Sequence, residues 1–596
     1  MRITRNKLII SLSCAWMAIS LLTPVKAEQS FRDWEMKQFK DSMEEDYMNL
    51  HFSVKNPAKY GIQVKDISLG KAPSRKEYEK GLEENKKSLE ELKQFDRSKL
   101  SEQEKVDYDV LKDYLEESGS QNFYDFQFHF LPQSGLVTNL TTNFTEFKIK
   151  NEEDIKNYLK VLESVPSYVD GALTMTKDQA GRGFFMSDKA LDETISQINK
   201  FVRKKKDSAL ILTFHEKVRA IKGLSSAKKA EYEKKNRELV LQSYIPCYEK
   251  IRKELGALRG SRKGKTLYDM KGGLTYYSHL LRQKSNSKGS PKEIFGVVDK
   301  ALDKEVQSLV SVAMSSKESE VEEKLPPKDP TAILEGHKKN LEKLFPTPAK
   351  VQYKASYLDP SVANDGVVAY YLNPMIDDIQ NNVIRINKKA VSNTNEMYST
   401  LAHEGYPGHL YQMTWYLNTN PHPIRSVVSH IGYSEGWAMY VEDAMWQFSG
   451  MNKKAVEYNR SLTNINYMLS AAIDIGVNGL GWKQEDVVSY VNSKGLSGDV
   501  AKNLYDVVVR DPAAYVPYGV GLAQFLTMKY KVVEKLGVGS LKELHEVFLK
   551  NGDRPFWMVE KDVEDFLIKK GVQKEISFKN FIRDLIQGFQ ELILNG

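Results

Sequence analysis

The chain has almost no cysteine. Only Cys14 and Cys247 occur among its 596 residues, and Cys14 lies in an N-terminal apolar segment that has the features of an export signal. If that segment is removed, Cys247 remains alone and no internal disulfide can form. A chain of this length buries most of the surface that it exposes when unfolded, so its hydrophobic core can supply the stability.

Linkers, repeats and later apolar runs are also missing. No segment after Leu22 looks transmembrane, because spanning a bilayer takes about 20 consecutive apolar residues. No Gly/Ser-rich linker or internal repeat divides the chain, which favours one large unit over residues 28–596. Its best internal boundary is the charged and then proline-rich stretch at 315–331. We therefore expect an N-terminal lobe over about 28–325 and a second lobe over about 330–596.

A strong excess of charge is missing as well. The formal net charge is +7, and the first 27 residues contain four basic residues and no acid, so the rest of the chain carries only +3. This balance gives no electrostatic reason to expect a nucleic-acid partner.

The N-terminus has the three parts of a secretory signal peptide. Basic residues precede an apolar run from Leu8 to Leu22, and a small-residue cleavage site ends at Ala27. We expect cleavage after Ala27, a periplasmic or secreted protein, and no stable membrane partner afterwards. Lipidation at Cys14 is less favoured, because Ser11 stands where a lipobox has an aliphatic residue. An uncleaved anchor is disfavoured because the apolar run is short for a bilayer span.

Most of the remaining sequence has helical periodicity. Apolar residues recur at helical spacing among Glu and Lys at 76–117, 151–164, 188–206, 225–254 and 292–314. Two β-like runs, 367–372 and 382–387, stand out between 351 and 387. We predict a mainly α protein with a small sheet, and we take 382–387 as an edge strand beside the functional site.

Residues 403–409 and 435 carry the clearest chemical signal. The run His-Glu-Gly-Tyr-Pro-Gly-His supplies two imidazoles and a carboxylate, and a second carboxylate follows at Glu435. A catalytic zinc needs about three protein ligands and one open position, and His₂Glu is a recurring set. We predict one Zn²⁺ per chain, bound by His403, His409 and Glu435. Glu404 would take a proton from the zinc-bound water and pass it to the leaving group.

The spacing of the two histidines is unusual. Zinc-binding histidines on one helix are commonly four residues apart, which places both on one face, whereas His403 and His409 are six apart. At about 100° per residue they would diverge by roughly 120° on a regular helix. We therefore expect the helix to break or bulge at Pro407 and Gly408.

A second helix is expected to present Glu435. The segment 434–445 is rich in Ala, Met and Trp, with Ser434 as a candidate N-cap. Glu435 would either interact with the helix N-terminus or reach the zinc. Glu442, on the same face, would either orient a ligand histidine or form a structural salt bridge.

These motifs together resemble the large bacterial family known as domain of unknown function 885, which is grouped with the zincin peptidases. The resemblance spans nearly all of the chain after the signal segment. It implies a mostly helical, two-lobed fold around a deep cleft, similar to angiotensin-converting enzyme, thimet oligopeptidase and the thermostable carboxypeptidases. It is carried by residues 403–409, Ser-Glu-Gly-Trp-Ala at 434–438, Tyr440 and Glu442, Asn-Pro at 56–57, Tyr-Gly at 60–61, the helix at 158–169, and Leu-His-Glu at 544–546.

The same resemblance implies further site residues. Tyr518 matches a tyrosine whose phenol hydrogen-bonds the oxyanion in related peptidases, although 31 tyrosines make packing a frequent alternative. Arg510 and His545 occupy family-like positions and could bind a substrate carboxylate or stabilise the transition state, whereas Arg510 could instead pair with a nearby Asp. The chain has Pro-Ala-Ala at 512–514 where family members carry Pro-Gly-Gln.

The sequence therefore predicts an exported zinc metallopeptidase that acts on short peptides. Two alternatives stay open: an inactive helical binding protein of the same fold, and a zinc hydrolase of a non-peptide amide or ester. The residues do not distinguish endopeptidase from exopeptidase, and they leave the oligomeric state unknown.

Overall fold

The computed structural model describes residues 30–321, 323–326, 328–358 and 367–573. The expected signal peptide and its cleavage site lie outside these residues. Within them, no helix is both long and apolar enough to cross a membrane.

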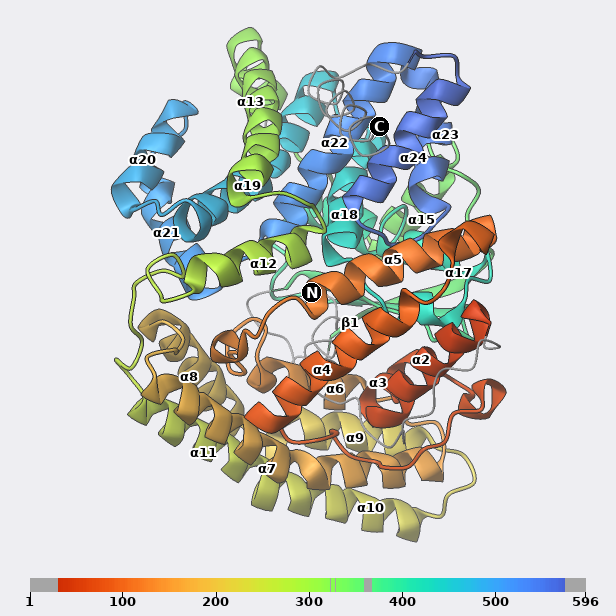
Figure 1. Ribbon diagram of the computed structural model, residues 1–596, viewed down its shortest axis with the longest axis vertical. Helices are drawn as coiled ribbons and strands as arrows, with labels where there is room; N and C mark the ends of the chain where they lie inside the picture. The colour runs from red at the N-terminus through yellow and green to blue at the C-terminus, as the bar shows by residue number, and fades with distance from the viewer. Residues whose placement is uncertain (1–29, 322, 327, 359–366, 574–596) are drawn as a thin grey trace, which may run out of the picture.

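The described part is mainly helical, with one small sheet, as the sequence predicted (Figure 1). The elements, in chain order, are α2 (Phe31–Glu45), α3 (Tyr47–Ser53), η1 (Pro57–Tyr60), α4 (Arg75–Leu92), η2 (Arg97–Lys99), α5 (Glu102–Ser118), η3 (Tyr124–Phe126), α6 (Leu136–Glu146), α7 (Glu152–Gly181), α8 (Asp188–Val202), η4 (Lys205–Asp207), α9 (Ala209–Ala220), α10 (Ser226–Leu239), η5 (Val240–Tyr244), α11 (Ile245–Ala257), α12 (Gly273–Ser285), α13 (Pro291–Ser315), α14 (Glu318–Val321), α15 (Pro330–Leu341), β1 (Gln352–Tyr357), β2 (Ala369–Leu372), β3 (Asn381–Ile386), α16 (Thr394–Glu404), α17 (His409–Leu417), η6 (Pro423–Ser426), α18 (Ile431–Met445), η7 (Trp446–Phe448), α19 (Lys453–Gly479), α20 (Gln484–Ser493), α21 (Asp499–Arg510), α22 (Val516–Leu536), η8 (Val538–Ser540), α23 (Leu541–Leu549) and α24 (Phe556–Lys569).

Helix starts follow the local capping chemistry. Ser101 before α5, Asn151 before α7 and Ser290 before α13 each accept a hydrogen bond from the backbone three residues on, while the acid at that position bonds back. Such reciprocal pairs satisfy backbone N–H groups that a helix start leaves without intrahelical partners. These caps fix where the charged, amphipathic segments begin.

The sheet has three strands in the order β1-β3-β2. β1 and β3 are parallel, with Gln352 opposite Asn381, and β2 and β3 are antiparallel, with Tyr371 opposite Ile384. The prediction of a strand at 382–387 is confirmed, but its assignment as the edge strand is wrong. β3 is paired on both sides, so it has no edge to offer a substrate. The sequence pattern indicates which segments are strands, but it does not indicate which strands pair with each other.

Two large clusters of buried side chains form the interior. One is built from α6 to α11, which lie at one end of the molecule (Figure 1). The other surrounds α18, α19 and α22 at the opposite end and already includes α12 and α13. The boundary expected near 325–330 therefore does not separate the two clusters. Helices α12 and α13 instead pack into the core that encloses residues 403–435.

Candidate metal centre

The run at 403–409 folds as the end of one helix, a turn and the start of another. α16 ends at Glu404, and α17 begins at His409. The peptide bond between Tyr406 and Pro407 in the turn is cis. The predicted break in the helix is confirmed, and it lets two histidines six residues apart face the same point.

Glycine is required at Gly408 for a steric reason. A Cβ there would lie 1.7 Å from the carbonyl oxygen of His403, far inside contact distance. The second histidine can therefore fold back under the end of α16 only if this position has no side chain. The turn is also held from outside, because the Trp437 indole N–H donates to the Pro407 carbonyl at 3.0 Å.

Glu435 is presented by α18, which starts at Ile431 rather than at Ser434. The expected N-cap role of Ser434 is therefore wrong, and Glu435 lies beyond the first turn of the helix. Asn286 supplies the cap instead, since its side-chain oxygen accepts from the N–H groups of Gly432 and Tyr433 at 2.6 and 3.2 Å. This partner is about 150 residues away in sequence, so the local pattern could not indicate it.

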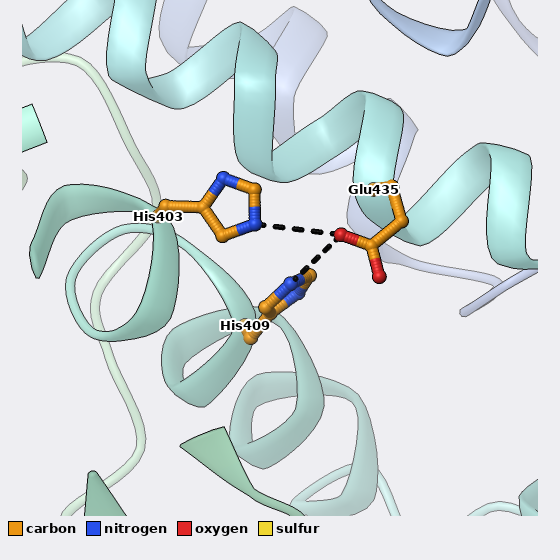
Figure 2. A group of neighbouring side chains, drawn as sticks. All are labelled: His403, His409 and Glu435. Atoms are coloured by element: carbon orange, nitrogen blue, oxygen red, sulfur yellow. Dashed lines mark ion pairs between the residues drawn. The ribbon is translucent and has the colours of Figure 1, made fainter. Parts of the chain in front are cut away.

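His403, His409 and Glu435 converge as predicted (Figure 2). Oε2 of Glu435 lies 3.4 Å from Nε2 of His403 and 3.3 Å from Nε2 of His409. A tetrahedral zinc with bonds of roughly 2.0–2.1 Å holds its ligand atoms roughly 3.3–3.4 Å apart. All three side chains are buried. The donor types and the two separations from Glu435 therefore fit a zinc ion, and all three ligand atoms lie within 4.8 Å of one another.

Glu442 orients the first histidine. Its Oε1 accepts from Nδ1 of His403 at 2.7 Å, so a neutral ring keeps its proton on Nδ1 and turns the lone pair of Nε2 toward Glu435. Burial alone would lower the pKa of His403, but Glu435 and Glu442 together raise it to about 10. The cluster thus carries concentrated negative charge that a cation would balance. The contact of Glu442 with His403 matches the role of orienting a histidine, which was one of the two roles expected for Glu442.

Glu404 lies beside the cluster without joining it. Its Oε1 is 4.0 Å from Nε2 of His403, and its Oε2 accepts the backbone N–H of Tyr371 in β2 at 2.8 Å. Burial raises the pKa of Glu404, which strengthens it as a proton acceptor near neutral pH. The sequence indicated a strand at Tyr371 but not that its N–H would hold this carboxylate.

Tyr518 packs over the first ligand histidine. Its ring lies 6.3 Å from that of His403, with 24° between the ring planes, and Tyr467 flanks it on the other side at 5.6 Å. The chain departs from the family pattern at Ala513, just before α22, the helix that carries Tyr518. The φ of Ala513, +62°, is in the left-handed region that favours glycine. Its N–H donates to the buried Asp474 at 2.7 Å, which fixes the turn in place of a glycine.

His545 is held by contacts that match a packing role. Its Nε2 accepts from the Tyr440 hydroxyl, and its Nδ1 donates to the Leu344 carbonyl, both at 2.7 Å. Burial lowers the pKa of His545 to about 3, so the ring is neutral, and it stacks on Phe345 with the centroids 4.3 Å apart. The substrate-binding role expected for His545 therefore gains no support from its contacts.

Arg510 forms its ion pair outside the cluster. Its partner is Glu193 of α8, at 3.0 Å, while Asp506 pairs with Lys189. This contact ties α21 to α8. The expected contact with a substrate carboxylate stays a prediction.

Two further histidines near the motif do not belong to the cluster. Nδ1 of His422 accepts the backbone N–H of Ile424 at 3.3 Å. His430 is buried at the start of α18, where burial lowers its pKa to about 3. The cluster that could hold a metal is thus limited, among the described residues, to His403, His409 and Glu435.

A sequence model of one family matches most of the chain. It is described as "Bacterial protein of unknown function (DUF885)" and covers residues 58–563. No curated protein sequence matches.

Several solved structures resemble the fold. A protein from Colwellia psychrerythraea described as a "putative lipoprotein" aligns with a TM-score of 0.78 at 17% identity, over 90% of this chain and 98% of that one. A "putative lipoprotein of unknown function" from Shewanella oneidensis aligns with a TM-score of 0.57 at 17% identity, over 91% and 100% of the two chains. At these identities the likeness concerns the fold alone.

Proposed function

The chain belongs to the DUF885 family of bacterial proteins of unknown function, and within it we propose that this member is a zinc-dependent peptidase. The observation that carries the proposal is the convergence of His403, His409 and Glu435, whose ligand atoms lie within 4.8 Å of one another. Oε2 of Glu435 is 3.4 and 3.3 Å from the Nε2 atoms of the two histidines. A carboxylate that is no ligand, Glu404, lies next to them. This set combines a metal site with a general base, which are the two requirements of zinc-dependent hydrolysis.

Each protein group has a defined task in this proposal. Bound zinc would lower the pKa of water and polarise the substrate carbonyl. Glu404 takes a proton from the attacking water and returns it to the leaving amine, which requires that the carboxylate stay fixed. The Tyr371 N–H holds one of its oxygens and leaves the other facing His403.

Tyr518 is the proposed donor to the oxyanion. It lies beside His403, and removal of a comparable donor costs about 3–4 kcal/mol of barrier in other hydrolases. Short peptides are the proposed substrates. Of the described strands, β2 is the outer one next to Glu404, so it takes the substrate-pairing role that we had assigned to β3.

We also propose that the protein acts outside the cytoplasm. The support is the signal-like segment 1–27, together with two fold neighbours described as lipoproteins. N-terminal sequencing of the exported protein tests this proposal. A start at Glu28 supports cleavage after Ala27, whereas a blocked, lipid-modified N-terminus at Cys14 supports anchoring.

Metal content is the first test of the activity. Elemental mass spectrometry of the wild type should find about one zinc per chain, and His409→Ala should hold much less. Glu404→Gln is the matched control, because it lies beside the site and is no ligand, and it should retain the zinc. A wild type that takes up no zinc from a zinc-containing buffer would overturn the proposal and favour the binding-protein alternative.

Activity is the second test. Zinc-loaded wild type should cleave members of a short-peptide library, and Glu404→Gln should lower kcat/KM by at least about 100-fold with zinc retained. Cleavage of small amides or esters but of no peptide would favour the non-peptide hydrolase. Peptide cleavage that is unchanged in Glu404→Gln would remove the general base from the mechanism.

A further inference from the structure

An open cavity of about 80 Å³ lies at the end of α18 that precedes Glu435. Its wall is formed by α5, by the end of α12 with the following loop, and by the first residue of α18. That residue, Ile431, is four positions before Glu435. Residues four apart on a helix share a face, with Cβ atoms about 5–6 Å apart. The cavity therefore lies one helical turn from a predicted zinc ligand.

The acids of the cavity wall are matched by cations. Asp113 pairs with Lys288 at 3.0 Å and also accepts from an indole N–H. Glu117 accepts three hydrogen bonds from Arg282, the shortest at 2.9 Å, and contacts His279 at 2.8 Å. The lining holds these two acids and three cations, and the remaining cation is Lys284.

Lys284 stands apart from these pairs. Among the described residues, no hydrogen bond or ion pair engages its ammonium group, and the side chain is half-buried in the cavity wall. Burial lowers its pKa, and the charges of Asp511 and Glu435 oppose that shift. Lys284 thus lines the cavity, and its charge interacts favourably with that of Glu435, a proposed zinc ligand.

The backbone fixes this position. At Gly432 of α18, a Cβ would lie 2.3 Å from the carbonyl oxygen of Ser285 and 2.8 Å from that of Lys284. The last turn of α12 is therefore pressed against the first turn of α18, and Asn286 bonds the two together. Lys284 thus projects from a rigid support, which a specificity-determining group needs.

We propose that Lys284 binds a carboxylate of the substrate, so that the enzyme prefers short peptides with a negative charge close to the scissile bond. The inference rests on the proposed peptidase function and deepens it. A half-buried ammonium without a direct partner gains a charge-assisted hydrogen bond when a carboxylate enters. On a short peptide that carboxylate comes from the C-terminus or from an acidic side chain.

Paired substrates distinguish these sources. The best peptide from the library screen is prepared with a C-terminal carboxylate and with a carboxamide, and a second, amidated pair carries Asp or Asn next to the C-terminus. We expect the wild type to favour an acidic member by roughly 10- to 100-fold in kcat/KM. Preference in the first pair identifies the C-terminus, and preference in the second identifies a side chain. No preference in either pair would overturn the proposal.

Variants separate binding from structural support. Lys284→Met should abolish the preference by slowing only the acidic peptide, and Lys284→Arg should keep part of it. Lys288→Met is the matched control, since it removes a cation from the same wall that is already paired with Asp113, and it should leave the preference intact. Equal loss on acidic and neutral peptides in Lys284→Met, with zinc content unchanged, would show a supporting role and refute carboxylate binding.

A binding measurement keeps the two proposals apart. The tetrapeptide Ala-Ala-Phe-Ala and its amide are titrated calorimetrically into zinc-loaded Glu404→Gln, with and without Lys284→Met. Tighter binding of the acid that depends on Lys284, without turnover by the wild type, would support the carboxylate site and refute the peptidase. Turnover by the wild type, with equal affinity for the acid and the amide, would support the peptidase and refute the carboxylate site.

Discussion

Replacing Glu442 should weaken zinc binding without removing a ligand. Its carboxylate holds Nδ1 of His403 at 2.7 Å, and both residues are nearly buried, with 7% and 8% of their surfaces exposed. Glu442→Gln keeps an acceptor for the ring N–H but loses the charge, whereas Glu442→Ala loses both. Groups that orient a ligand histidine commonly contribute 10- to 100-fold in metal affinity. We expect about 10-fold weaker zinc binding for Gln, or about 1.4 kcal/mol, and about 100-fold for Ala.

Competition with a chromophoric zinc chelator measures these affinities, and thermal melting of the zinc-free proteins reports stability separately. Asp443→Asn is the matched control, because Asp443 follows Glu442 on the same helix but pairs with Arg460 and Lys529 on α19 and α22. It should lower stability and leave zinc affinity within about twofold of wild type. An orienting role for Glu442 would be refuted if both Glu442 variants bound zinc as tightly as the wild type. It would also be refuted if Asp443→Asn lost as much zinc affinity as the Glu442 variants.

Two further predictions concern the supports of the site. Gly408→Ala should lose zinc, because its Cβ would lie 1.7 Å from the His403 carbonyl oxygen. Gly256→Ala is the control and should keep zinc, because a Cβ at Gly256 meets no atom within 4 Å. Elemental analysis of both variants measures the zinc content. Burial raises the pKa of Asp474 to about 7, above roughly 3.9 in an unfolded chain. Between these values the folded state keeps a proton that the unfolded state has lost, so stability falls as pH rises. Denaturant unfolding of the zinc-free wild type should therefore lose roughly 2 kcal/mol relative to Asp474→Asn between pH 5 and pH 7, and parallel pH profiles would contradict the shift.

The sequence predicted the parts of the site that depend on local chemistry. His403, His409 and Glu435 differ from surrounding residues by ligand type, and Pro407 with Gly408 marks a break that covalent geometry requires. The helical class follows from periodicity over long segments. The structure confirms that His403, His409 and Glu435 converge, whereas zinc binding and catalysis are proposals.

Features set by distant contacts could not be predicted. The edge-strand assignment was wrong because alternation of side chains is the same in an outer and a central strand. His545 was chosen by position, but its partners Tyr440 and Leu344 lie about 100 and 200 residues away. Lys284 is likewise one lysine among many in sequence, and only the packing of α12 against α18 places it in the same cavity wall as Ile431.

The turn at 405–408 shows how a six-residue spacing can still form a compact site. In a regular helix the second histidine would point away from the first, and a bound ion could not reach both. Here the first helix ends one residue after His403 and the next helix begins at His409, so both imidazoles project from helix termini. Correct placement then depends on the position of the second helix, which Trp437 fixes by donating to the Pro407 carbonyl. Because Trp437 lies two residues after Glu435, the helix that supplies Glu435 also holds the turn that positions the two histidines.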